Sequence, residues 1–150
     1  MKVIAQNKKA YHDYDILEKI EAGIVLTGDE VKSLRAGQVS LIGSFAAIRN
    51  GQLTLVNCRI APYDKAYFKD EEAATRSRVL LLHKRQIFRL LGEITQKGIT
   101  VVPLLIYFTS KNLAKIELGV AKHKKAPDRK KELRERDIKR ETSRAMKERR

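Results

Sequence analysis

The sequence is short of the features that mark secreted proteins and membrane proteins. Its 150 residues include a single cysteine, Cys58, so no disulfide can form within the chain, and a reducing compartment is expected. No run of 18 apolar residues is present, so no membrane span is predicted. The first residues also lack the apolar core of a signal peptide. These absences favour a cytoplasmic protein without membrane association.

Residues that usually carry catalysis are few and dispersed. His12, His83 and His123 have no cysteine or carboxylate at metal-ligand spacing, and no phosphate-binding glycine motif is present. Cys58 falls in an expected strand, where a core position explains it better than a nucleophile does. We therefore predict no enzyme activity, no catalytic residue, no cofactor and no metal site. A nuclease or a modifying enzyme is the alternative that a turnover assay would test.

Acidic residues are the scarcer charge type. The chain has 32 Lys and Arg against 18 Asp and Glu, a net charge of +14, and a pI of about 10.0. This charge favours a polyanionic partner, nucleic acid before an anionic membrane. The excess is concentrated at the C-terminus, because Lys122–Arg150 contains 14 basic and 6 acidic residues. Two parts are predicted: a folded domain over residues 1–121 and a basic tail over residues 122–150.

Alternation of apolar and polar residues predicts a mainly β domain. The expected strands are Tyr14–Leu26, Ser44–Ile48, Leu53–Val56, Arg78–Leu82, Ile99–Phe108 and Ala114–Val120. Ile60 and Tyr63 are expected to continue the sheet, and Val3–Ala5 to form a brief extended piece. Asn50-Gly51 is a hairpin signal, since a type I′ turn needs positive φ at both central residues. Pro103 cannot donate to a ladder and is expected at an edge or a bulge.

Closing such a sheet into a barrel would remove its exposed edges. The predicted fold class is therefore mainly β: a small closed antiparallel barrel of the oligonucleotide-binding (OB) type, with two to three flanking α-helices and a basic C-terminal tail.

Two helices are expected beside the strands. Thr27 and Glu30 form a capping box at the start of a helix over Gly28–Ala36, and Gly37 suits a left-handed stop. A second helix is expected over His83–Lys97. Its apolar stripe, which Phe88 borders, consists of Ile87, Leu90, Leu91 and Ile94.

The tail carries helix-supporting pairs four residues apart, Glu132–Arg136 and Glu135–Lys139, but no apolar stripe. An isolated helix persists only when tertiary packing buries one face of it. We expect the tail to be disordered alone and helical on a partner.

Basic and aromatic residues are interleaved in a way that suits RNA, because rings stack on unpaired bases while Lys and Arg meet phosphates. Each ring could equally be an ordinary surface or core aromatic, and each cation a solvated charge. The candidate RNA contacts of this kind are Lys8, Lys9, Tyr11, His12, Tyr14, Lys32, Arg35, Arg76, Arg78 and Lys84.

Glu21 is expected to point away from the apolar face of its strand. Phosphate repels a carboxylate, so Glu21 would serve RNA binding only by accepting from a base amine or a 2′-hydroxyl, or by orienting a cation. An ordinary cross-strand partner role is the alternative.

Several motifs resemble those of the small protein B family, in that family's order and spacing. They are GIVLTGDEVKSLRAG, the Asn-Gly hairpin, LLLHKRQI, KGITVVPLLIYF and AKIELGVAK. The resemblance covers nearly the whole chain. It implies an OB-type barrel that binds the tRNA-like domain of transfer-messenger RNA (SsrA RNA). It also implies delivery of that RNA to stalled ribosomes for trans-translation, at the small-subunit decoding centre.

The resemblance further implies roles for individual residues. Asn7, Glu21 and Leu81 match positions of the family's RNA-binding surface, although the pattern alone predicts Leu81 in the core. The tail is implied to lie in the vacant mRNA channel, and a monomer is expected. The residues of the tail expected to meet the ribosome are Lys122, Lys124, Lys125, Asp128, Arg129 and Lys130. A general ribosomal RNA-binding protein without a dedicated transfer-messenger RNA partner is the alternative.

The chain departs from the family pattern in three places. His123 stands before Lys124-Lys125 where the family usually has Gly, and Ala73-Ala74-Thr75 replaces an Asp-Pro before an Arg pair. Pro127 stands where an aromatic or His usually precedes the Asp-Lys-Arg motif, so stacking from that position is in question.

Overall fold

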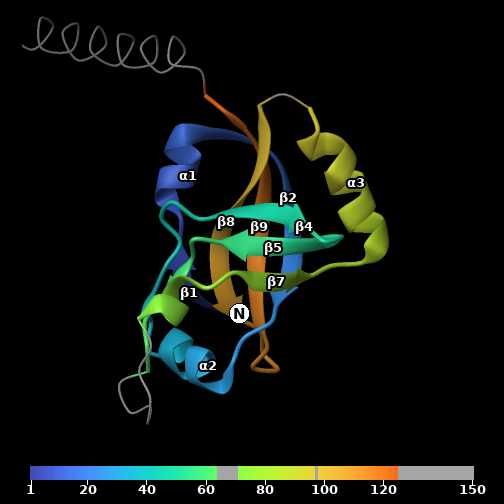
Figure 1. Ribbon diagram of the computed structural model, residues 1–150. Coiled ribbons are helices and arrows are strands. Elements are labelled where there is room, and N and C mark those ends of the chain that lie inside the picture. Colours follow the sequence, from blue (N-terminus) through green and yellow to red (C-terminus); the bar gives the residue numbers. More distant parts are fainter. Residues whose placement is uncertain (64–70, 97, 125–150) are drawn as a thin grey trace, which may run out of the picture.

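The structure, a computed structural model, describes residues 1–63, 71–96 and 98–124 (Figure 1). The strands are β1 (Lys2–Gln6), β2 (Tyr14–Ile24), β3 (Val39–Ser40), β4 (Phe45–Arg49), β5 (Gln52–Val56), β6 (Arg59–Ile60), β7 (Arg78–Leu81), β8 (Ile99–Phe108) and β9 (Ala114–His123). The helices are α1 (Lys8–Asp13), α2 (Gly28–Arg35) and α3 (Lys84–Ile94), with a short 3₁₀ helix, η1 (Glu72–Thr75).

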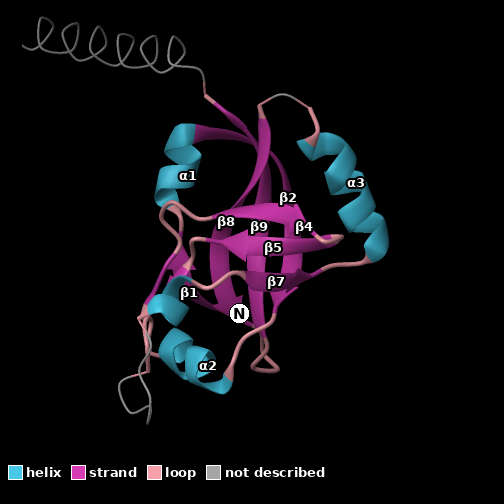
Figure 2. Cartoon of the chain, viewed as in Figure 1, coloured by secondary structure: helices cyan, strands magenta, loops and turns pink. Residues whose placement is uncertain are grey.

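Seven strands form one antiparallel sheet in the order β1-β8-β4-β5-β7-β2-β9, and β9 also pairs with β8. The pairings therefore run from β8 through five neighbours and back to β8. β3 and β6 form a separate two-stranded sheet. The three helices lie around the periphery of the strands (Figure 2). The prediction of a mainly β, antiparallel domain with flanking helices is confirmed.

Local signals in the sequence determine several of these elements. Asn50 and Gly51 have φ values of 53° and 74°, and they join β4 to β5 as a tight hairpin. A register shift in the β8–β9 pairing falls between Pro103 and Leu105, which agrees with the second of the two predicted placements of the proline, an edge or a bulge. Gly37 follows α2 with a φ of 76°, a left-handed conformation that glycine adopts without strain.

Apolar residues alternate along the strands because they point to the side of the sheet that forms the core. Leu53, Leu80 and Ile116 of the strands are fully or almost fully buried there, and Leu34 of α2 and Leu90 of α3 pack in the same core. Burying each large aliphatic side chain contributes about 1.5–3 kcal/mol.

Among the described residues, no helix has the length and apolar character that a membrane span requires.

Some elements differ from the sequence-based predictions. α1 was not expected, and Tyr63 lies outside the strands. The short 3₁₀ helix η1, before β7, was also not among the expected elements. β9 continues through His123, so the predicted boundary between residues 121 and 122 falls inside a paired strand.

Candidate nucleic-acid interface

The outer face of β2 and β7 brings Glu21 and Leu81 onto one surface. Leu81 pairs with Gly23 across the β2–β7 ladder, and it is 57% exposed. A Cβ on Gly23 would lie 3.2 Å from the Cβ of Leu81, so the bare glycine leaves room for the leucine. Because alternate residues share a face of a strand, Glu21 lies on the same side as Gly23. The pattern-based prediction of a core Leu81 is wrong, because its side chain covers a glycine on the outside of the sheet.

A tyrosine holds the carboxylate of Glu21. The hydroxyl of Tyr107, on β8, donates a hydrogen bond to Oε2 of Glu21. Tyr107 is buried, and burial, the bond to Glu21 and the nearby charge of Glu117 raise the pKa of its phenol above the usual range. The phenol therefore stays protonated and remains a donor, which orients an exposed carboxylate on the sheet surface.

A mixed set of charges continues this surface along β2 and β9. Glu117 lies opposite Glu21 in the ladder, and Nζ of Lys19 lies 3.8 Å from Oε1 of Glu117. Lys19 also sits 5.7 Å from the ring centroid of Tyr11. Sequence reasoning missed Lys19, Glu117 and Tyr107. The signal for the first two was their place at the polar positions of alternating strands.

The predicted N-terminal residues gather at the end of β9. Tyr14 pairs with His123, and the two rings meet edge to face at 5.0 Å between centroids. The backbone N–H of Lys124 donates to the carbonyl of Asp13, 3.0 Å away. These contacts bring α1 and the start of the tail together. The predicted residues on the exposed side of α1 are Lys8, Lys9, Tyr11 and His12.

Asn7 has a structural role that the resemblance did not predict. Its side chain is 5% exposed, caps α1 by accepting from the Ala10 N–H at 3.2 Å, and donates to the carbonyls of Leu41 and Pro103 at 3.3 and 3.0 Å. All its polar atoms are therefore used inside the protein. The prediction that Asn7 contacts RNA directly is corrected: its side chain anchors α1 to β8.

The capping box that opens α2 is confirmed. The backbone N–H of Thr27 donates to Oε1 of Glu30 at 2.9 Å, and the N–H of Glu30 donates to the Thr27 hydroxyl at 3.2 Å. Lys32 and Arg35 are exposed on this helix. Their cationic groups lie over aromatic rings: Tyr63 at 5.2 Å and Phe108 at 5.7 Å, respectively.

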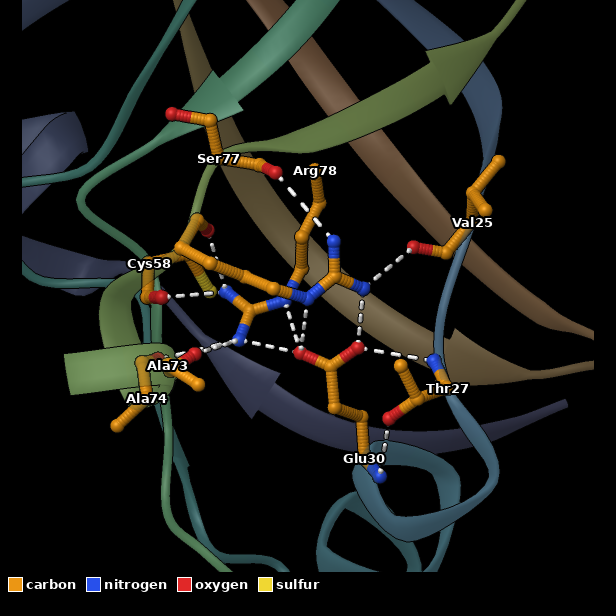
Figure 3. A network of polar contacts seen from close by, with 9 residues as sticks. Val25, Thr27, Glu30, Cys58, Ala73, Ala74, Ser77 and Arg78 are labelled. Carbon is orange, nitrogen blue, oxygen red and sulfur yellow. Dashed lines mark hydrogen bonds and ion pairs between the residues drawn. The ribbon is translucent and has the colours of Figure 1, made fainter. Parts of the chain in front are cut away.

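A buried ion-pair cluster joins α2 to β7 (Figure 3). Arg78 has no exposed surface; its Nε donates to Oε2 of Glu30 at 2.6 Å, and its Nη1 donates to the Cys58 carbonyl at 2.7 Å. Its Nη2 donates to the Ala74 carbonyl at 3.1 Å. Arg76 donates to both carboxylate oxygens of Glu30. The predicted RNA contact at Arg78 is therefore wrong, because its guanidinium is used up inside the fold.

The cluster fixes the charge of Glu30. Burial acts to raise the pKa of this carboxyl, but hydrogen bonds from Arg76, Thr27 and Arg78 together bring it below its usual value. Cys58, a core residue beside the cluster, has its thiol pKa raised by burial to about 11. The expected core position of Cys58 is confirmed, but the expected strand position is wrong, because Cys58 lies between β5 and β6.

The remaining predicted contacts lie elsewhere. Lys84 is exposed at the start of α3, three residues after Leu81. Lys122 is exposed at the end of β9, where it pairs with Asp15 and Ile99. Four predicted tail contacts lie outside the described residues: Lys125, Asp128, Arg129 and Lys130. In the part of the chain that the structure describes, no group of three or more His, Cys, Asp and Glu could hold a metal ion.

Comparisons with known proteins place the chain in a family. The model of the SmpB protein family matches residues 4–148. An SsrA-binding protein of Carboxydothermus hydrogenoformans is 53% identical over 148 residues, covering 99% of this chain and 98% of that protein. An SsrA-binding protein of Coprothermobacter proteolyticus is 50% identical, covering 96% of both chains.

A solved structure is also similar. Its description is "tmRNA-SmpB: a journey to the center of the bacterial ribosome", and one of its chains matches with a TM-score of 0.69 and 52% identity. The match covers 84% of this chain and 87% of that one. Because the family model spans almost its whole length and relatives share about 50% of its residues, this chain belongs to the SmpB family.

Proposed function

We propose that this protein binds the tRNA-like domain of transfer-messenger RNA and delivers it to stalled ribosomes for trans-translation. The observation that carries this proposal is the outer face of β2 and β7, where the exposed Glu21 and Leu81 lie together. Family membership and the net charge of +14 both indicate that the partner is a polyanion.

The chemistry of this face suits a structured RNA better than a plain cationic surface would. Glu21 is held by Tyr107 and accepts from a base amine or a 2′-hydroxyl, which phosphate cannot offer. Leu81 supplies an apolar contact for a ribose or a base. We assign phosphate contacts to cations that are exposed or partly exposed on several elements: Lys8, Lys9, Lys19, Lys32, Arg35, Lys84 and Arg76, which also pairs with Glu30. Tyr11, His12 and Tyr14 add rings for stacking.

The ring of strand pairings that returns to β8 supports an OB-type barrel as the binding unit, over residues 1–121 with the last residues of β9. In this proposal the tail, residues 122–150, occupies the vacant mRNA channel through its net positive charge. The six tail residues predicted to meet the ribosome keep that role. Because Pro127 has no aromatic ring, no base stacking is assigned to that position, while His123 meets the ring of Tyr14 edge to face.

The protein acts as a monomer in the cytoplasm and performs no bond chemistry itself. Peptidyl transfer belongs to the ribosome, and the protein supplies binding and position.

A competition measurement tests the proposal. The labelled tRNA-like domain is bound to the protein, and unlabelled elongator tRNA of equal length or unlabelled tRNA-like domain is added. The tRNA-like domain should displace the label at a much lower concentration. Equal displacement by both RNAs would instead support a general ribosomal RNA-binding protein.

Truncation tests the division between barrel and tail. Because β9 runs through His123, the chain should end after Lys124. This variant should fold, bind the tRNA-like domain with modest loss, and fail to support peptide tagging on stalled ribosomes. Tagging at the full-length rate would overturn the role of the tail.

A further inference from the structure

Phe88 is the most exposed of the large apolar side chains among the described residues. It is 80% exposed and lies in the middle of α3. Leu90 lies on the inward side of α3 and is fully buried. Because successive helical residues are 100° apart, Phe88 and Leu90 point to nearly opposite sides. Phe88 is therefore not a loose core residue, and its ring stands on the solvent side of the helix.

The residues one turn away from Phe88 are of two kinds. Lys84 and Arg85, four and three positions before it, share its side of the helix and are exposed. Gly92, four positions after it, has nothing within 4 Å of where a Cβ would be. Leu91, three positions after Phe88, is 44% exposed. The ring is therefore flanked by two cations toward the start of α3, and by an apolar side chain and a bare glycine toward its end.

The cations beside the ring differ from the third cation of α3. Arg89 is held by Glu18 of β2 at 2.5 Å. Within the described residues, neither Lys84 nor Arg85 forms a salt bridge, so both charges are available to a binding partner. An apolar protein partner would have to desolvate both cations, whereas a polyanion is attracted by them. An aromatic face next to two cations matches a nucleotide, which presents a base for stacking and phosphates for pairing.

The position of α3 makes this surface continuous with the proposed interface. Leu81, at the end of β7, is exposed on the outer sheet face, and α3 begins three residues later at Lys84. An RNA bound across β2 and β7 therefore passes close to the first turn of α3.

We propose that the outer face of α3 is a second RNA contact, where an unpaired base stacks on Phe88 and the adjoining phosphates meet Lys84 and Arg85. This inference rests on the proposed function and extends it, because it adds a base-stacking site outside the sheet. The base can come from transfer-messenger RNA or from ribosomal RNA; the chemistry is the same for both.

The chain offers a direct spectroscopic test, because it contains no tryptophan. In Phe88→Trp the only indole stands on α3 and keeps a ring for stacking. Its fluorescence is measured while the tRNA-like domain is added in one titration and ribosomes that carry no transfer-messenger RNA in another. Quenching with the tRNA-like domain assigns the base to transfer-messenger RNA. Quenching with ribosomes alone assigns it to ribosomal RNA. Quenching with neither overturns the proposal.

Substitutions separate stacking from apolar docking. Phe88→Ala should weaken binding to the RNA identified by quenching about 5- to 150-fold, the effect of removing one base stack. Phe88→Leu keeps an apolar side chain but loses the ring, so it should behave like Phe88→Ala. Normal binding by Phe88→Leu would indicate an apolar protein contact and contradict the stacking site. Changing Lys84 and Arg85 together to Gln should lower the slope of log affinity against log salt by about 1.4–1.8, since each phosphate contributes about 0.7–0.9.

Ile42→Ala is the matched control, because Ile42 is an exposed apolar residue, 64% exposed, in the turn before β4. It should leave RNA binding unchanged. Glu21→Gln separates this inference from the proposed function. If Glu21→Gln loses affinity for the tRNA-like domain while Phe88→Ala keeps its affinity for the RNA identified by quenching, the stacking site on α3 is wrong and the proposed function stands. If the unaltered protein does not prefer the tRNA-like domain, the proposed function itself fails.

Discussion

Glu21 and Glu30 lie on either side of the turn from β2 into α2, and their surroundings are opposite. Glu21 is exposed on the sheet, accepts one bond from Tyr107 and faces another acid, Glu117, across the ladder. The side chain of Glu30 is 12% exposed and accepts from two guanidinium groups and the Thr27 N–H. These two carboxylates of one basic protein thus have different roles. They differ in how far they are buried and in how many hydrogen-bond donors surround them.

The same comparison applies to the cations. Arg78 carries the same unit charge as Lys19, but its charge is neutralised and its donors are satisfied inside the protein. A net charge of +14 therefore overstates the charge that RNA meets at the β7 side of the molecule. The polar residues of the buried cluster should control stability, and those of the outer face should control affinity.

The largest expected effect is that of Arg78→Met. It removes one partner of a buried pair, so Glu30 and the carbonyls of Cys58 and Ala74 lose donors. The free energy of unfolding should fall by about 3–5 kcal/mol, measured by denaturant titration. Arg76→Met is the matched control, and its effect should be smaller because the Arg76 side chain is 35% exposed and Arg78 still holds Glu30. Unchanged stability of Arg78→Met together with weaker RNA binding would make Arg78 an RNA contact after all.

Removing the helix cap should have a smaller effect on stability. Thr27→Ala loses the hydroxyl that accepts from the Glu30 N–H, and the free energy of unfolding should fall by about 1 kcal/mol. Thr27→Ser keeps an acceptor and should recover most of the loss. Affinity for the tRNA-like domain should be unchanged in both variants. A loss of affinity without a loss of stability would place the cap in the interface.

Tyr107→Phe should act mainly on binding. The exposed Glu21 carboxylate can be solvated when the phenol is removed, so the cost in stability should be about 0.5–1.5 kcal/mol. Affinity for the tRNA-like domain should fall because Glu21 is no longer oriented. A double-mutant cycle with Glu21→Gln checks the mechanism. If Tyr107 acts through Glu21, the second substitution should add almost nothing, whereas full additivity would mean that the two residues act separately.

The smallest effect is expected from mild acid. Because the pKa of Glu30 is lower in the folded protein than its ordinary value of 4.5, its contribution to stability is fully present above pH 4.5. It should be lost as the pH falls through the lower, folded-state pKa. Comparing unfolding free energies between pH 5 and pH 3 for the unaltered protein and Glu30→Gln measures this. An equally steep decline in both would mean that other groups carry the acid sensitivity.

Much of the fold follows from local patterns. The alternation in β2, β8 and β9, the Asn50-Gly51 turn and the capping box at Thr27 each depend on residues close in sequence, and each was predicted. α1 was not predicted because a six-residue helix depends on tertiary contacts. Those contacts come from the Asn7 side chain, whose partners lie far along the chain.

The site was predictable only in part, for a similar reason. The resemblance identified Glu21 and Leu81, and the structure brings them to one face. The pairing of Glu30 with Arg78 spans 48 positions, so no local pattern could reveal that this arginine is buried. Tyr107 was missed because it lies in a run of apolar strand residues. Nothing in that run shows that the Tyr107 hydroxyl reaches Glu21 on β2.

The most direct test compares Glu21→Gln with Glu30→Gln, with both quantities measured on each. The free energy of unfolding comes from denaturant titration, and affinity for the tRNA-like domain is measured where both variants are folded. We predict that Glu21→Gln loses about 1–3 kcal/mol of binding free energy at nearly unchanged stability. Glu30→Gln should lose stability and keep its affinity. Tighter binding by Glu21→Gln, or an affinity loss in a stable Glu30→Gln, would contradict the division between the outer face and the buried cluster.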